Sequence, residues 1–398
     1  MTALRFAIRS LGRRPGRAWL GILGVAAAAA LMFDMLLLSR GLVVSLAELL
    51  DAFGFDVRVM ASEGIGASRD PLEQAAEVAA TLARLPEVDA VVPLRFESAD
   101  AAVEDEDLRV SVVGVGMSGR RVWTVIEGRD LATDGSAGPE VIVNRRLAER
   151  AGLEPGSSLA LRGRCSREPS AAPSLDVRIA GIGDFPFDAA ESLTVAAWLP
   201  DLDRLCHTST GEAQLLLVAS RPEVGPDVAV EAIRRARPDL VAFSNDEVIE
   251  RFERVGFAYF QQISASLALV TIAFGTVLIT VLLTVSVNQR LGEIAALRAI
   301  GFTRRRAATD VLWQAGLLVG AGGLVAIPLG LALSVWFDGI LRAFPGVPAT
   351  ISFFVFEPRT LWLHVGLLGA IACGGALYPA WLVTRLPIAT TLRNEVVS

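Results

Sequence analysis

Four apolar segments constrain the fold of this 398-residue chain more than any other feature. Each is long enough to cross a bilayer, which takes about 20 mainly apolar residues per helix. They are residues 18–40, 263–287, 311–336 and 361–383. One span stands near the start and three stand together at the end, with more than 200 residues after the first. The sequence therefore predicts a membrane protein with one large domain outside the bilayer.

The placement of arginine predicts the side of each connecting segment, because short basic segments stay in the cytoplasm. Residues 1–17 carry five arginines and no acid, and residues 288–310 carry five arginines against two acids. The tail at 384–398 carries Arg385 and Arg393. We expect all three segments in the cytoplasm and residues 337–360 outside. Both termini are then cytoplasmic.

The segment at 41–262 has the opposite charge balance. It holds 22 arginines and 37 acids, a formal charge of −15, whereas the whole chain carries −6. We expect it to be extracytoplasmic. The basic start, the apolar run and Ala26–Ala30 also resemble a cleaved secretory signal, but the length of the run favours an uncleaved anchor.

Lysine is absent from the sequence, and all 37 basic residues are arginine. A phosphate-binding GxxxxGK[ST] loop is therefore impossible within these residues. If the protein uses a nucleoside triphosphate, we expect another polypeptide to hydrolyse it.

Short strand and helix patterns alternate through the outer segment. Strands at 55–60, 88–96 and 108–115, with a helix from Asp70 to about Leu85, form a β-α-β-β pattern, and a second β-α-β pattern follows at 213–243. These indicate the two halves of a split ferredoxin-like domain. Further short strands are predicted between the halves, with a helix at 145–151, and indicate an inserted β-rich lobe: 139–144, 158–161, 177–182 and 193–198. The predicted fold class is thus four transmembrane α-helices with a large α+β extracytoplasmic domain between spans one and two.

Helical patterns also extend beyond two of the spans. One begins at Asn245 or Asp246 and continues toward Val287, and residues 42–53 can continue the first span. About 42 helical residues measure about 63 Å, roughly twice the hydrocarbon thickness. We expect these extensions to form stalks below the outer domain.

The sequence contains few candidate catalytic or metal-binding residues. Cys165 and Cys206 lie in the outer segment, and the sequence leaves a disulfide and two unpaired packing cysteines equally open. Cys206-His207 is adjacent rather than spaced for zinc, so we expect no metal site. No nucleophile elbow or acid pair is present, so we expect no catalytic residues and no enzyme activity.

A short charged stretch, residues 289–306, separates the second and third spans. Its apolar residues recur at three-residue spacing beside charged ones, which indicates an amphipathic helix. Gly301 suits a left-handed C-cap and Thr303 suits the start of the next helix. A helix lying on lipid is the alternative, but the alanine-rich apolar face favours a protein partner.

This stretch resembles the cytoplasmic segment of the FtsX/MacB-type permease family of ABC transporters. Residues 290–301, RLGEIAALRAIG, look like the R-x-x-E-I-A-x-L-R-A-x-G pattern of that family. Tyr378-Pro379-Ala380-Trp381, Leu392-Arg393, Glu127-Gly128-Arg129 and residues 139–147 support the resemblance, as does the order of one span and then three.

The resemblance implies a permease without its own ATPase, working as a dimer with two copies of a cytoplasmic ABC ATPase. ATP and Mg²⁺ would then be bound by that partner, with no cofactor on this chain. Nucleotide-driven closure would move the coupling helix, the stalks and the outer domains. The coupling residues expected from this match are Arg290, Glu293, Ile294, Leu297, Arg298 and Gly301.

Two further groups lie in the spans. Gly316, Gly320 and Gly323 permit close helix approach, either within the chain or to a second copy. Asp34 and His364 lie toward the outer ends of spans one and four, and intramembrane polar groups are functional candidates. A snorkelling or hydrogen-bonded Asp34 is the alternative to a functional one.

The leading functional hypothesis is export or extraction of a hydrophobic or amphiphilic cargo, such as a lipid, lipoprotein, peptide or drug. The alternative is a transmembrane signal transmitter that regulates a cell-wall hydrolase and transports nothing. Expected partners are the ATPase dimer, a second permease copy, membrane lipids and a periplasmic adaptor, with no nucleic acid. The expected location is the bacterial inner membrane.

Overall fold

The computed structural model places the chain in two compact units, which are described separately. The outer unit comprises Val43–Gly256 and Arg342–Ile351, and the membrane unit comprises the remainder. The structure describes residues 15–62, 70–103, 106–118, 120–133, 138–165, 173–208, 211–255, 258–289, 291–299, 301, 303–344, 348 and 350–385.

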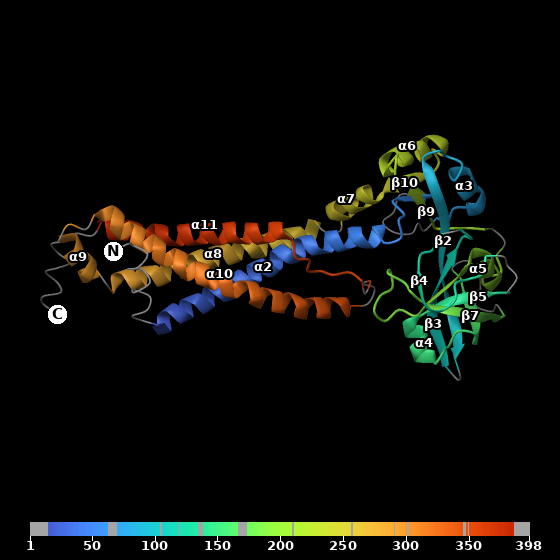
Figure 1. The fold of residues 1–398 in the computed structure, drawn as a ribbon, viewed down its shortest axis with the longest axis horizontal. Helices are drawn as coiled ribbons and strands as arrows, with labels where there is room; N and C mark the ends of the chain where they lie inside the picture. The colour runs from blue at the N-terminus through green and yellow to red at the C-terminus, as the bar shows by residue number, and fades with distance from the viewer. Residues whose placement is uncertain are drawn as a thin grey trace. The chain divides into compact units, whose positions relative to one another are not determined.

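Among the described residues, four helices are long and apolar enough to cross a membrane, as predicted. They are α2 (Pro15–Asp51), α8 (Ala258–Asn288), α10 (Arg304–Arg342) and α11 (Pro358–Arg385), and the short helix α9 (Leu291–Ala299) joins α8 to α10 (Figure 1). Large apolar side chains such as Leu324, Val335 and Trp362 are exposed on these helices, which suits a lipid environment.

Small residues set the packing of the membrane helices. Gly322 of α10 lies against Val25 of α2, and Gly375 of α11 lies against Ile279 of α8. A helix in lipid gains little from burying apolar surface, so such close backbone approaches provide much of its packing. The remaining core of this unit consists of buried aliphatic side chains from α2, α8, α10 and α11.

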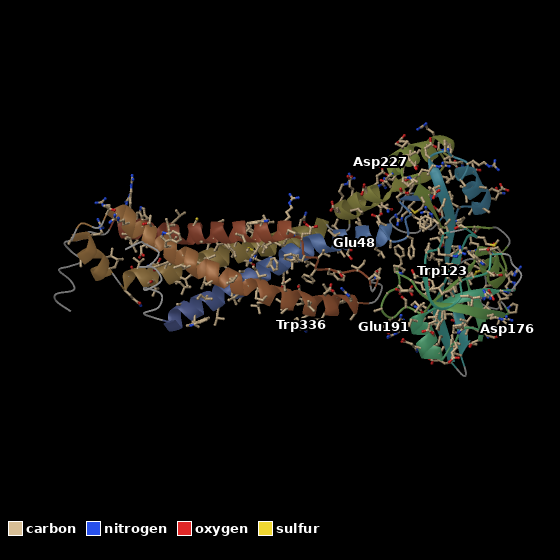
Figure 2. All side chains as sticks on the ribbon, viewed as in Figure 1. Glu48, Trp123, Asp176, Glu191, Asp227 and Trp336 are labelled. Atoms are coloured by element: carbon tan, nitrogen blue, oxygen red, sulfur yellow. A yellow bond between two sulfur atoms is a disulfide. The ribbon has the colours of Figure 1, made fainter. Side chains whose placement is uncertain are left out.

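The outer unit is built on a single ten-stranded sheet. Its strand order is β10-β1-β9-β2-β3-β8-β5-β7-β4, with β6 paired to β2 and β7. The strands are β1 (Val57–Met60), β2 (Val88–Val103), β3 (Glu106–Val115), β4 (Thr124–Gly128), β5 (Glu140–Asn144), β6 (Ser158–Arg164), β7 (Leu175–Asp184), β8 (Thr194–Trp198), β9 (Leu215–Ser220) and β10 (Val241–Ser244). Figure 2 shows charged side chains distributed over this unit.

Five helices accompany the sheet: α3 (Ala75–Leu82), α4 (Arg145–Ala151), α5 (Leu199–Leu205), α6 (Pro226–Ala236) and α7 (Asn245–Val255). Strand residues alternate between faces, so Leu216 and Val218 of β9 join the core under α3 and α6. Leu215 and Leu217 join a different core on the opposite face. A third core packs α4 and α5 against the other end of the sheet.

The α+β outer domain is confirmed. The predicted ferredoxin-like part and the predicted β-rich lobe share one sheet. The long hairpin of β2 and β3 continues from one part into the other, because β2 pairs with β9 near its start and with β6 near its end. Strand β3 then pairs in parallel with β8. Glu104 and Asp105, which connect β2 to β3, lie outside the described residues.

Three details differ from the sequence predictions. The helix expected from Asp70 begins at Ala75, because the backbone of Leu72 pairs with Ala213 as an isolated bridge. Strand β4 and helix α5 were not predicted. The first helix does continue to Asp51 as expected, whereas the junction of α7 and α8 at 256–257 lies outside the described residues, so that continuity stays a prediction.

Cys165 and Cys206 form a disulfide, with their Cα atoms 5.7 Å apart. The bridge links the end of β6 to the end of α5, which lie 41 residues apart in the chain. Sequence alone left this pairing open because it does not give the distance between the two thiols.

Candidate functional site

The predicted coupling segment folds as the short helix α9, and one side of it is buried. Ala295 is fully buried, and Leu291 and Ile294 pack against the core of the membrane unit. Arg298 donates a hydrogen bond to the carbonyl oxygen of Val383 at the end of α11 (3.3 Å). Helix α9 is therefore held to the transmembrane helices by its own apolar and polar contacts.

The ends of this segment have the predicted caps. Gly301 has a φ of 107°, a conformation that favours glycine, and its amide donates to the carbonyl of Arg298. The Thr303 hydroxyl accepts from the amide of Arg306 (3.4 Å), at the start of α10. Arg290 and the side chains of Glu293 and Leu297 lie outside the described residues, so their roles stay predictions.

The three predicted packing glycines separate into two groups. A Cβ atom built on Gly323 would lie 2.5 Å from Leu368 Cδ1, so α10 and α11 pack closely there. At Gly316 and Gly320, no described atom lies within 4 Å of such a Cβ atom, and this side of α10 is exposed. Gly323 and the neighbouring Gly322 thus serve packing inside the chain, while Gly316 and Gly320 face away from its other helices.

The two intramembrane polar candidates are both fully buried. Neither carboxylate oxygen of Asp34 and neither ring nitrogen of His364 has a hydrogen-bond partner among the described residues. The His364 ring contacts the ring of Phe33, the residue before Asp34, with centroids 5.0 Å apart. Asp34 lies on α2 and His364 lies on α11. No described hydrogen bond or ion pair joins the two side chains.

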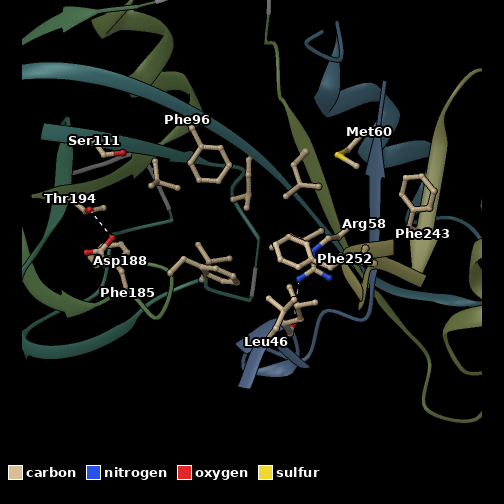
Figure 3. Close-up of a pocket in the computed structure, with 18 of the residues that line it drawn as sticks. Leu46, Arg58, Met60, Phe96, Ser111, Phe185, Asp188, Thr194, Phe243 and Phe252 are labelled. Atoms are coloured by element: carbon tan, nitrogen blue, oxygen red, sulfur yellow. Dashed lines mark hydrogen bonds between the residues drawn. The ribbon is translucent and has the colours of Figure 1, made fainter. Parts of the chain in front are cut away.

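A cavity of about 480 Å³ opens in the outer unit, and no sequence motif predicted it. Apolar side chains of the sheet line it, among them Met60, Leu94, Leu217 and Phe243. Leu46 and Leu50 at the end of α2 and Phe252 of α7 form another part of the lining (Figure 3). The only sequence signal for it is that alternate strand residues on both faces of the sheet are apolar.

Polar groups stand at opposite ends of this cavity, as Figure 3 shows. At one end, Asp188 accepts hydrogen bonds from Thr194 and Asn144, each at 2.7 Å. Burial raises the pKa of Asp188, and its two hydrogen bonds oppose that effect. At the other end, burial lowers the pKa of Arg58 to about 10, although the charge of Asp51 acts in the opposite direction.

Arg58 is the centre of a polar cluster where α2, β1 and α7 meet. Its guanidinium group donates to Asn245 Oδ1 and to the carbonyl of Leu50. Asn245 in turn donates to Asp51 and to the carbonyl of Phe55 (3.0 Å). This cluster joins the end of α2 to the start of α7.

Within the described ranges, no group of three or more His, Cys, Asp or Glu side chains is placed to hold a metal ion. His364 lies in α11, and His207 follows the disulfide-bonded Cys206.

Family models match both parts of the chain. Residues 18–236 match the MacB-like periplasmic core domain, and residues 265–388 match the FtsX-like permease C-terminal domain. The first match alone spans more than half of the chain. The chain belongs to the FtsX/MacB-type family of ABC transporter permeases. This permease therefore has a MacB-like periplasmic domain between its first and later membrane helices.

Curated relatives of this permease include two macrolide export ATP-binding/permease proteins named MacB. That of Vibrio parahaemolyticus is 25% identical over 84% of this chain and 52% of the relative. That of Sodalis glossinidius is 24% identical over 80% of this chain and 48% of the relative. The permease thus spans about half the length of the curated relatives it matches.

Among solved structures, the periplasmic region of MacB from Actinobacillus actinomycetemcomitans is similar to part of this chain. It is 15% identical, covers 52% of this chain and 98% of that structure, and has a TM-score of 0.39.

Proposed function

We propose that this chain is the transport subunit of an ABC exporter whose ATP is hydrolysed by a separate cytoplasmic subunit. One observation carries the proposal: both family domains of an ABC permease occur in a sequence that contains no lysine. A nucleotide-binding loop of the GxxxxGK[ST] type needs that lysine, so the hydrolysing site belongs on other residues. ATP and Mg²⁺ would be bound there.

Helix α9 is the proposed contact for the ATPase. Leu291, Ala295 and Arg298 of α9 contact the membrane helices. Because of these contacts, a displacement of α9 would also displace α11 and α8. Positions 293 and 297 are four residues apart and share one side of the helix. Glu293 and Leu297 are the proposed contacts on that side.

The outer domain is the proposed receiver of this movement. Helix α2 is continuous over 37 residues, about 55 Å, which exceeds the hydrocarbon thickness of about 30 Å. The cluster of Arg58, Asn245 and Asp51 joins its outer end to α7 and the sheet. Movement of α2 along its axis would therefore be transmitted to the sheet through this cluster.

The proposed location is the bacterial inner membrane, with both termini and α9 in the cytoplasm. The arginine distribution supports this orientation. The Cys165–Cys206 disulfide supports an oxidising compartment for the outer domain. The proposed partners are an ABC ATPase dimer, a second permease copy, lipids and a periplasmic adaptor. The two MacB relatives are named as macrolide export proteins, which supports a hydrophobic or amphiphilic substrate.

Co-purification tests the proposed contact. Glu293→Arg combined with Leu297→Asp should abolish recovery of the cognate ATPase with the permease. The first change reverses the charge at a proposed polar contact, and the second puts a carboxylate at a proposed apolar contact. Membrane insertion and the thermal unfolding midpoint should stay unchanged. Glu191→Arg, an exposed charge reversal in the outer unit, is the control and should recover the ATPase normally. Unchanged recovery with the double variant would exclude α9 as the main contact.

A further inference from the structure

The cavity of the outer unit has the size and lining of a small-molecule site. The cavity has a volume of about 480 Å³ and is partly open to the surface. Pockets for small ligands measure roughly 300–1,000 Å³ and are mainly apolar with a few polar groups. Phe96 and Phe187 line this cavity and remain 38% and 48% exposed, which leaves apolar surface accessible from outside.

Its charges are compensated unequally. Arg58 donates hydrogen bonds to Asn245 and to a carbonyl group, and the charge of Asp51 lies near it. The guanidinium carbon of Arg251 lies 4.0 Å from the centre of the Phe243 ring. Asp188, by contrast, is bonded to the neutral donors Thr194 and Asn144, and within the part of the chain that the structure describes it forms no ion pair.

A half-buried carboxylate at the end of an apolar pocket is suited to a cation. It offers a charge-assisted hydrogen bond to an ammonium group, and such bonds are about twice as strong as neutral ones. The hydroxyl groups of Ser111 and Ser192 line the same region and can accept further donors. The apolar floor then matches a hydrocarbon or ring system attached to that cation.

We propose that this pocket binds a small cationic amphiphile, with its apolar body against the accessible side chains of Phe96, Phe187 and Leu46 and its ammonium group at Asp188. The bound molecule would contact Leu46 of α2 and Phe252 of α7 (Figure 3). Helix α2 is itself continuous with the first span, and α7 precedes the second span in the chain, so occupancy would favour one position of these two helices over others. The pocket would thus report its ligand to the membrane helices.

The regulatory part of this inference rests on the proposed function, but binding does not. Binding is measurable on the full permease without an ATPase, so failure of ATPase coupling and failure of ligand binding are separate results.

The test uses the full chain in nanodiscs of phosphatidylcholine and a photoreactive dodecylamine that carries a diazirine near its methyl end. Mass spectrometry should place the cross-links within the pocket lining, at Phe96, Phe187 or Phe252. Dodecylamine should displace the probe at concentrations about tenfold lower than dodecyl sulfate. Labelling confined to the membrane helices would show lipid partitioning alone and would overturn the proposal.

Asp188→Asn isolates the role of the charge. The variant should weaken displacement by dodecylamine about tenfold and leave displacement by dodecanol unchanged. Glu191→Gln is the matched control, because it also removes one negative charge nearby but lies outside the pocket lining, and it should behave like the wild type. Equal dodecylamine displacement in wild type and Asp188→Asn would refute the assignment of Asp188.

A second variant keeps the test decisive if Asp188→Asn does not fold. Leu46→Trp adds bulk at a half-buried position of the lining and should reduce pocket labelling at least tenfold. Its thermal unfolding midpoint shows whether the fold is intact. A folded Leu46→Trp variant that labels as the wild type does would place the ligand elsewhere.

Discussion

At the scale of single residues, the junction of α2 with the outer sheet depends on a buried polar cluster. Arg58 and Asn245 are 8% and 6% exposed, so neither can exchange its partner for bulk water. A buried polar group that loses its partner costs more than the hydrogen bond itself contributes. Asn245 therefore determines whether the charge of Arg58 is tolerated at this point.

Asn245→Ala should lower the free energy of unfolding by about 1–3 kcal/mol, because Arg58 and Asp51 both lose a hydrogen-bond partner. Thermal unfolding of the purified permease measures the change. Arg146→Ala is the control, since its ion pair with Glu191 is exposed and should contribute roughly 0–1 kcal/mol. Equal effects of the two substitutions would contradict the importance given to this cluster.

At the scale of elements, the glycines of α10 divide the helix into a packed side and an open side. A Cβ atom on Gly322 would lie 2.6 Å from Val25 Cγ1 and 3.2 Å from the backbone nitrogen of Ala26. At Gly316 that space is open in the described structure. Adding one methyl group at each position should therefore have opposite effects.

Gly322→Ala should destabilise the membrane unit by about 1–3 kcal/mol, since α2 and α10 must move apart. Gly316→Ala should be neutral or stabilising by up to about 1 kcal/mol, because alanine favours helix more than glycine does. Thermal unfolding in nanodiscs compares the two. A loss of stability with Gly316→Ala would mean that this face of α10 is packed, and cross-linking would then identify a second copy.

Local patterns in the sequence predicted most elements but not their pairing. Strands such as Glu140–Asn144 and Thr194–Trp198 are short apolar runs between turn residues, so their positions were evident. Strand β4 is mostly exposed and lacks that pattern. The joining of both predicted parts into one sheet depends on contacts between distant segments, as β2 with β6 shows.

The candidate sites follow the same division. The caps at Gly301 and Thr303 were predictable because a cap depends on its immediate neighbours. The pocket was not, because its lining comes from strands and helices between Leu46 and Phe252. Asp188 had no sequence signal of its own, since its significance comes from the apolar surface around it.

At the scale of the whole molecule, the disulfide tests the proposed orientation. If residues 41–262 lie outside the cytoplasm, Cys165 and Cys206 should be oxidised in protein isolated under alkylating conditions. Cys206→Ser should free one thiol and destabilise the outer unit by roughly 2–4 kcal/mol, because the bridge closes a loop of 41 residues. Cys373→Ser, at the described free cysteine, should leave the disulfide intact and the stability of the outer unit unchanged. Two reactive thiols at 165 and 206 in the native membrane would contradict the orientation.

We propose that this permease is driven through α9 by an ATPase on another subunit. The most direct measurement is the rate of ATP hydrolysis by the cognate ATPase in nanodiscs, with wild-type permease and with the Glu293→Arg, Leu297→Asp variant. We expect wild-type permease to change the rate at least several-fold and the variant to leave it at the value for the ATPase alone. An equal effect of both permeases on the rate would contradict the claim.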